Sequence, residues 1–146
     1  MLVSRGHVVR GTTRSPARRH QIEAAGAEAA IADPDRVATL GLALERVTIA
    51  CLLLGSAVGA PEQLATLHGA RLEMLLQRLV DTPVRALVYE AQGSVEDAVL
   101  AGGTERVRAF CEEAHIPYAL LAADPGDHGS WTGAAAAAVE RALGTR

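Results

Sequence analysis

The stretch RGHVVRGTTRSPAR, from Arg5 to Arg18, decides how the rest of the chain is divided into elements. Gly6 is typical of a residue that closes a helix, and the run HVVRGTT over residues 7–13 predicts a β-strand. Ser15-Pro16 then predicts the start of a second helix. The protein is therefore expected to begin with the end of one helix, followed by a strand and a new helix.

This order of strand and helix recurs along the whole chain. Strands are predicted at residues 7–13, 28–33, 47–54, 84–90 and 116–123, and helices at 16–25, 35–45, 61–80, 96–114 and 131–143. Such alternation predicts an α/β protein, a three-layer α/β/α sandwich around a five-stranded, mostly parallel sheet. The runs VTIACLLL and IPYALLAA are apolar on both faces, so the third and fifth strands are expected to be interior or well covered, whereas EAAIAD suits an edge.

The composition limits the number of domains and the kinds of partner. A chain of 146 residues is expected to form a single domain over residues 1–146. The net charge of -3 is spread along the sequence, which argues against nucleic acid and membrane surfaces as partners. No run has the length of a membrane span or the apolar core of a signal peptide, so we expect a cytoplasmic protein. Cys51 and Cys111 lack CxxC spacing and are expected to be reduced, packed thiols.

Lysine is absent, and all 14 basic residues are arginine. Mechanisms that need a lysine amine are therefore excluded. They include the phosphate-binding lysine of P-loop proteins, a Schiff-base lysine, and the Tyr-x-x-x-Lys pair of short-chain dehydrogenases.

Four pieces of the chain together resemble the NAD(P)-binding Rossmann domain of the extended or atypical short-chain dehydrogenase/reductase family, the NAD-dependent epimerase/dehydratase type. The pieces are RGHVVRGTTRSPAR, GAEAAIADPDR, VTIACLLLGSA and TPVRALVYEAQGSV, and their spacing is preserved from residue 1 to about Asp124. The resemblance implies a Rossmann-like fold in which MLVSRG is the end of the first helix. The first strand and the Gly-rich phosphate loop are then expected to be missing.

The resemblance implies that the retained part contacts the adenosine half of NADP. In the family, the residue after the second strand selects the cofactor, and an arginine there pairs with the extra phosphate of NADP. Thr13-Arg14 stand at that place and Arg18 follows one turn later. The alternative is that Arg14, Arg18 and Arg19 are only the solvated start of a helix.

Two further positions match cofactor contacts of the family. Asp33 matches the acid that hydrogen-bonds the adenine amino group, and Leu54, Gly55 and Ser56 match the turn beside the cofactor ribose. Asp33 also suits a cap or turn before Pro34, and a plain turn explains residues 54–56 equally well.

The catalytic pattern of the family is not matched. At the spacing of the lysine, Tyr89 is followed by Gly93 and Tyr118 by Ala122. Glu90, with Tyr89 beside it at the end of the fourth predicted strand, is the remaining candidate for a catalytic group, and the alternative is a surface carboxylate.

No metal site is expected from the sequence. The loop ADPGDHGSW brings Asp124, Asp127 and His128 together, which is too few ligands for a metal centre. The other histidines show neither HxxxH nor HExxH pairing.

Loss of the first strand would leave a gap in the family sheet order 3-2-1-4-5-6. Closing the gap gives the order 2-1-3-4-5, whereas a partner chain or swapped segment could fill it instead. A third outcome is that the sequence is a truncated or mis-started form of a longer protein.

The predicted helix Glu62–Val80 has apolar residues on two sides. Leu72, Leu76 and Leu79 form one stripe with Ala65 and Gly69, and the apolar residues off that stripe are Leu64, Leu67, Met74 and Leu75. The second side belongs either to a homodimer interface or to a thick core within one subunit.

These observations lead to one functional hypothesis and two alternatives. The first is an NAD(P)-binding-like protein without catalytic activity, acting as a weak nucleotide binder or a non-catalytic subunit. The alternatives are an NADP-dependent oxidoreductase or epimerase whose phosphate-binding segment lies outside this chain, and a structural dimerisation module.

Overall fold

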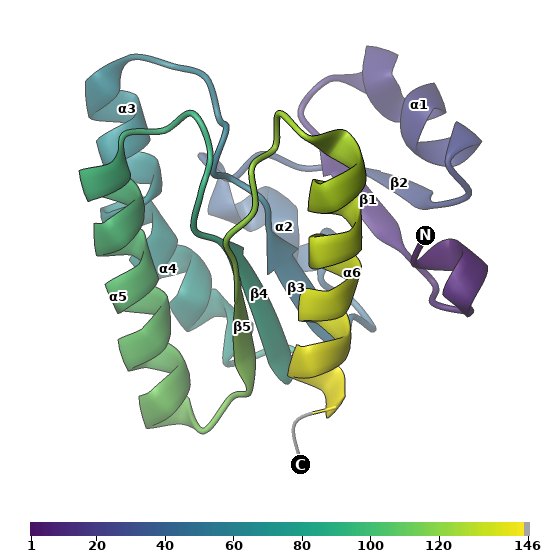
Figure 1. Ribbon diagram of the computed structural model, residues 1–146. Coiled ribbons are helices and arrows are strands. Elements are labelled where there is room, and N and C mark those ends of the chain that lie inside the picture. The colour runs from purple at the N-terminus through teal and green to yellow at the C-terminus, as the bar shows by residue number, and fades with distance from the viewer. Residues whose placement is uncertain (145–146) are drawn as a thin grey trace. The chain divides into compact units, whose positions relative to one another are not determined.

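The computed structural model describes residues 1–144, which form an α/β protein with five parallel strands (Figure 1). The chain divides into two compact units, the N-terminal unit Met1–Glu45 and the C-terminal unit Arg46–Arg146. No helix of the described residues combines the length and the apolar character needed to cross a bilayer.

The N-terminal unit contains a two-stranded parallel sheet. Its elements are the 3-10 helix η1 Val3–Arg5, β1 Arg10–Thr13, η2 Pro16–Arg18, α1 Arg19–Ala24, β2 Glu28–Ile31, η3 Val37–Thr39 and α2 Leu40–Ala43. Gly6 ends η1 with a φ of 89°, as the sequence predicted for a residue that closes a helix. In the sheet, Arg10 lies opposite Glu28 and Thr13 opposite Ile31.

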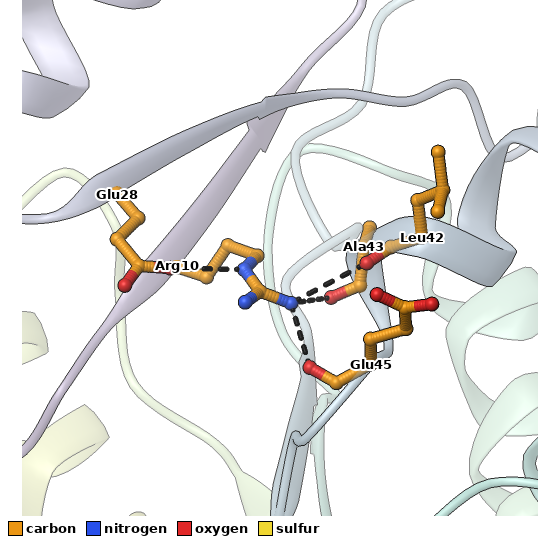
Figure 2. A network of polar contacts seen from close by, with 5 residues as sticks. All are labelled: Arg10, Glu28, Leu42, Ala43 and Glu45. Atoms are coloured by element: carbon orange, nitrogen blue, oxygen red, sulfur yellow. Dashed lines mark hydrogen bonds and ion pairs between the residues drawn. The ribbon is translucent and has the colours of Figure 1, made fainter.

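Arg10 ties β1 to the end of α2 (Figure 2). Its Nη1 donates to the carbonyl oxygens of Ala43 and Glu45, both at 2.8 Å, and to that of Leu42 at 3.4 Å. Its Nε pairs with Glu28 Oε2 at 3.2 Å. The last carbonyls of a helix lack partners within the helix and carry partial negative charge, so a guanidinium is well suited to bind them.

The C-terminal unit contains a three-stranded parallel sheet with β4 in the centre. Its elements are β3 Ile49–Leu52, α3 Pro61–Leu67, α4 Ala70–Leu79, β4 Ala86–Glu90, α5 Asp97–Ala114, β5 Tyr118–Leu121 and α6 His128–Gly144. Every residue of β4 is buried, because α6 covers one face of the sheet while α4 and α5 lie on the other (Figure 1).

The predicted α/β class and the five strand positions are confirmed, but the strands form two sheets rather than one sheet of order 2-1-3-4-5. The partial orders 2-1 and 3-4-5 are right, and the missing pairing is the one between β1 and β3.

The third strand was expected to be interior or well covered, but β3 is at the edge of its three-stranded sheet. Within the described residues β3 pairs with β4 alone. The Cys51 side chain is exposed by its accessible surface, yet surrounding protein atoms raise the pKa of its thiol to about 11 by desolvation, so the expectation of a packed thiol is met only in part. Cys111 is buried as expected, and burial, with a smaller contribution from Glu112, raises the pKa of its thiol to about 11. An apolar run shows that a strand has apolar neighbours but does not identify the central strand.

The predicted helix Glu62–Val80 is divided by a break at His68 and Gly69. Gly69 has a ψ of -112°, and a Cβ there would lie 2.7 Å from the Ala65 carbonyl oxygen. A residue with a side chain would therefore disturb the break, which turns the His68 side chain into the protein interior.

The break also changes which apolar residues of this segment are buried. Leu75, expected off the main stripe, is buried together with Leu72, Leu76 and Leu79, while Met74 is 51% exposed. A homodimer through this segment stays a prediction.

Candidate functional site

In the turn after β3, the peptide group that joins Leu54 to Gly55 is hydrogen-bonded on both of its sides. The Leu54 carbonyl oxygen lies 3.0 Å from His68 Nε2, and the Gly55 N–H donates to Glu90 Oε1 at 2.8 Å. This turn and Glu90 lie at the carboxyl ends of neighbouring parallel strands, because Leu52 of β3 lies opposite Tyr89 of β4. Open α/β sheets bind ligands at this edge.

Glu90 is buried, with 3% of its surface exposed, so the alternative of a surface carboxylate is wrong. Its second oxygen, Oε2, accepts a hydrogen bond from Trp131 Nε1 at 2.7 Å. Both carboxylate oxygens therefore have neutral donors, as a buried acid requires when no cation is paired with it.

His68 and Tyr89 form a second buried polar pair, with His68 Nδ1 2.5 Å from Tyr89 Oη. A carbonyl oxygen can only accept, so we assign the proton of the neutral imidazole to Nε2, which donates to Leu54. Nδ1 then accepts from the Tyr89 hydroxyl. Burial raises the pKa of Tyr89 to about 12, with Arg106 opposing and Glu90 adding to the shift, so the hydroxyl keeps its proton at neutral pH.

The pair is possible because Gly103 of α5 has no side chain. A Cβ at this position would overlap the Tyr89 hydroxyl and lie 2.8 Å from Tyr89 Cζ. The absence of a side chain at Gly103 therefore makes room for the tyrosine hydroxyl, which gives this glycine of α5 a packing role.

Burial lowers the pKa of His68 below its usual 6.5, while the hydrogen bond to Leu54 and the charge of Glu90 oppose this shift. The unfolded chain therefore binds a proton near pH 6.5 that the folded chain binds only at lower pH. Stability is expected to fall as the pH drops below 6.5 and to level off once the folded form is also protonated. Urea unfolding at pH 7.5, 6.5 and 5.5 measures this loss.

His68→Gln provides the comparison, because glutamine keeps a donor and an acceptor but does not titrate. Other titratable groups, such as Asp127, contribute equally to the pH dependence of stability in both proteins. The difference between the two pH profiles therefore measures the contribution of His68. Parallel profiles from pH 7.5 to 5.5 would show that the imidazole is not the group responsible.

The turn after β3 is also joined to the loop after β4. The Gly55 carbonyl oxygen accepts from the Val95 N–H at 3.0 Å, and Ser56 Oγ accepts from the Ser94 N–H at 3.3 Å. Ser56 itself is exposed. The two loops therefore form one connected surface at the carboxyl edge of the sheet.

In the N-terminal unit, Thr13 and Arg14 follow the end of β1. The Thr13 Oγ1 accepts from the Ser15 N–H at 3.1 Å, which shapes the turn into η2. The side chains of Arg14 and Arg18 are exposed, and neither has an ion pair or hydrogen bond to another residue in the range 1–144. They differ in this from Arg10, whose Nε and Nη1 are bound by the protein itself.

Asp33 lies at the same edge of this small sheet, because β1 and β2 are parallel and in register. Its Oδ1 accepts from the Asp35 N–H at 2.9 Å, and this hydrogen bond closes a turn around Pro34. Its backbone N–H donates to Thr39 Oγ1 at 2.9 Å. The structure thus brings Arg14 and Asp33 to one edge, and groups Leu54, Gly55 and Ser56 with Glu90 in the other unit.

The loop after β5 is organised as the start of a helix. Asp127 accepts from the Ser130 N–H at 3.2 Å and from the Ser130 hydroxyl at 2.9 Å, and these two bonds lower the pKa of its carboxyl. Asp124 Oδ1 accepts from the Gly126 N–H at 2.8 Å. Among residues 1–144 no three His, Cys, Asp or Glu side chains are grouped as metal ligands.

Two members of the site, His68 and Trp131, are not predicted from the sequence as site residues. For His68 a signal is present, because it stands four residues before Leu72 and so continues the apolar stripe of Leu72, Leu76 and Leu79. A polar residue on a buried stripe needs a partner inside the protein. Trp131 carries no comparable signal, because its partner lies 41 positions away.

Comparison with known proteins supports the fold. The structure is similar to that of triphenylmethane reductase from Citrobacter sp., solved in complex with NADP(H), with a TM-score of 0.58 and 17% sequence identity over 77% of this chain. The matched part spans 38% of the reductase. No protein-family model matches the sequence, and no curated protein matches it. The likeness shows a Rossmann-like α/β fold.

Proposed function

We propose that this protein is a non-catalytic relative of the extended short-chain dehydrogenases, and that it binds the adenosine half of NADP(H) weakly. The observation that carries the proposal is the pair of guanidiniums at Arg14 and Arg18, which follow a Rossmann-like strand and have no partner within residues 1–144. A 2′-phosphate is a strong acceptor for such donors. The reductase of similar fold binds the same cofactor.

The remaining residues fit an adenosine ligand. Asp33 uses Oδ1 for its own turn, which leaves Oδ2 for the adenine amino group. Ser56 and the backbone of the turn Leu54–Ser56 offer small polar groups beside a ribose.

The state of the polar residues supports a non-catalytic role. The Tyr89 hydroxyl is fully buried, is bound to His68 and has a pKa of about 12, so it is a poor proton donor or acceptor for a substrate. Both oxygens of Glu90 already accept hydrogen bonds from the protein. These groups are better suited to hold the site than to react in it.

A second proposal is that the chain is part of a longer NADP-dependent oxidoreductase or epimerase. The observation in its favour is that the match spans 38% of the reductase. In that case residues outside this chain would bind the pyrophosphate and the substrate. Turnover of NADPH by the longer protein, but not by this chain, would distinguish it from the first proposal.

Calorimetric titration with NADPH and NADH tests the cofactor assignment. We expect NADPH to bind more tightly than NADH, with a dissociation constant below the millimolar range. Arg14→Ala should weaken NADPH binding about tenfold, because one charge-assisted contact to the phosphate is lost, and leave NADH binding unchanged.

Arg78→Ala is the matched control, because Arg78 is an exposed arginine of α4 and its loss changes the net charge equally. Its affinities should equal those of the wild type. If neither dinucleotide binds below millimolar, or if Arg14→Ala binds NADPH as well as the wild type does, the assignment is wrong.

A further inference from the structure

The Leu54–Gly55 peptide is bound on both of its sides by buried side chains. His68 holds the carbonyl and Glu90 holds the amide, at 3.0 and 2.8 Å. We infer that His68 and Glu90 are positioning residues that fix this one peptide plane, so that the turn Leu54–Ser56 presents a single backbone conformation to the nucleotide. The inference rests on the function proposed above.

The geometry of a peptide explains why two contacts suffice. The C=O and N–H of one trans peptide lie in the same plane and point in opposite directions. Rotation of the plane would break both hydrogen bonds together, and it would leave a buried imidazole N–H and a buried carboxylate oxygen each without this partner. Such groups are costly to leave unsatisfied, so the plane has one favoured orientation.

Each positioning side chain is itself fixed by the core of the C-terminal unit. His68 stands at the break between α3 and α4 and is 1% exposed, and its other ring nitrogen is bound to Tyr89 of the central strand. Glu90 ends that same strand. The turn is therefore placed by a rigid sheet and helix rather than by its own loop, which is the arrangement that lowers the entropy cost of binding a ligand.

The two oxygens of Glu90 make it possible to separate positioning from simple packing. Oε1 binds the turn, whereas Oε2 binds Trp131 of α6. If Glu90 serves only to join α6 to the sheet, loss of the Trp131 bond should matter most. If it positions the turn, loss of the Gly55 bond should matter most.

The experiment compares Glu90→Gln with Trp131→Phe in the full chain. A glutamine has one acceptor oxygen, so the Gly55 N–H and the Trp131 Nε1–H would compete for it. Amide hydrogen exchange at Gly55, followed by NMR without nucleotide, should be faster in Glu90→Gln, and NADPH affinity should fall about tenfold. Trp131→Phe leaves Oε1 untouched and should keep both values close to those of the wild type.

A second pair of variants acts from the other side of the peptide. His68→Gln can still donate to Leu54 and accept from Tyr89, so it should retain NADPH affinity, whereas His68→Leu should lose about tenfold. This pair keeps the inference testable if Glu90→Gln does not fold.

Three outcomes would overturn the inference. In the first, Gly55 exchanges faster in Glu90→Gln but NADPH binds as in the wild type, so the fixed peptide is not used in binding. In the second, Trp131→Phe reproduces the loss, so Glu90 serves the α6 contact. In the third, exchange at Gly55 is unchanged in every variant. A wild type that does not bind NADPH would instead refute the proposed function, while the exchange data still decide whether the pair holds the peptide.

Discussion

Gly103→Ala is expected to lower the free energy of unfolding by about 3 kcal/mol, which combines overpacking with a lost buried hydrogen bond. The new Cβ would overlap the Tyr89 hydroxyl in the centre of the C-terminal unit. Because Tyr89 is fully buried, it cannot move aside without breaking its bond to His68. Urea unfolding followed by circular dichroism measures the loss.

Gly102→Ala is the control, one position earlier in the same helix. Its Cβ would meet only Arg106 Nη1, at 3.0 Å, which is the movable end of a long side chain. Alanine should therefore stabilise this protein by up to about 1 kcal/mol through helix propensity. Tyr89→Phe should recover part of the loss in the Gly103→Ala background. Equal stability of the two single variants would contradict the close packing at Gly103.

Arg10→Met is expected to destabilise the N-terminal unit by about 2 to 3 kcal/mol, since hydrogen bonds to a charged group contribute more than neutral ones. The change leaves the carbonyl oxygens of Ala43 and Glu45 and the carboxylate of Glu28 without the guanidinium (Figure 2). The unit has few buried apolar side chains to compensate; they are Ala32, Val37, Leu40 and Ala43. Hydrogen exchange measured by mass spectrometry on peptides from residues 1–45 should show faster exchange.

Arg14→Met removes the same charge four positions later, at a side chain that makes no contact of this kind within residues 1–144. Its exchange should match the wild type. Peptides from the C-terminal unit should be unaffected in both variants, because Arg10 bonds lie inside the N-terminal unit. Slow exchange retained in Arg10→Met would show that the unit is held by other contacts.

Much of the secondary structure follows from local sequence. All five strands lie inside the runs that predicted them, and α5 begins within one residue of its predicted start, because apolar periodicity and turn residues act over a few positions. The division into two sheets does not follow from such patterns. It is decided by which strands pair across long sequence separations, as Ala50 of β3 does with Leu87 of β4.

The same distinction applies to the site. The turn Leu54–Ser56 and the end of β4 at Glu90 can be placed from the sequence, since both follow apolar strands. The break at His68 and the partners of Glu90 cannot, because a residue in the middle of an apolar helix pattern reveals its partner only once distant elements pack. The roles of Thr13, Arg14, Arg18 and Asp33 stay predictions.

The distribution of aromatic residues between the units has a practical consequence. Phe110, Tyr89, Tyr118 and Trp131 all belong to the C-terminal unit, and residues 1–45 contain no phenylalanine, tyrosine or tryptophan. Intrinsic fluorescence and near-ultraviolet dichroism therefore report on the C-terminal unit. A protein whose N-terminal unit had unfolded would keep a native aromatic spectrum, so Arg14 and Asp33 could lose their arrangement while these optical signals stayed normal.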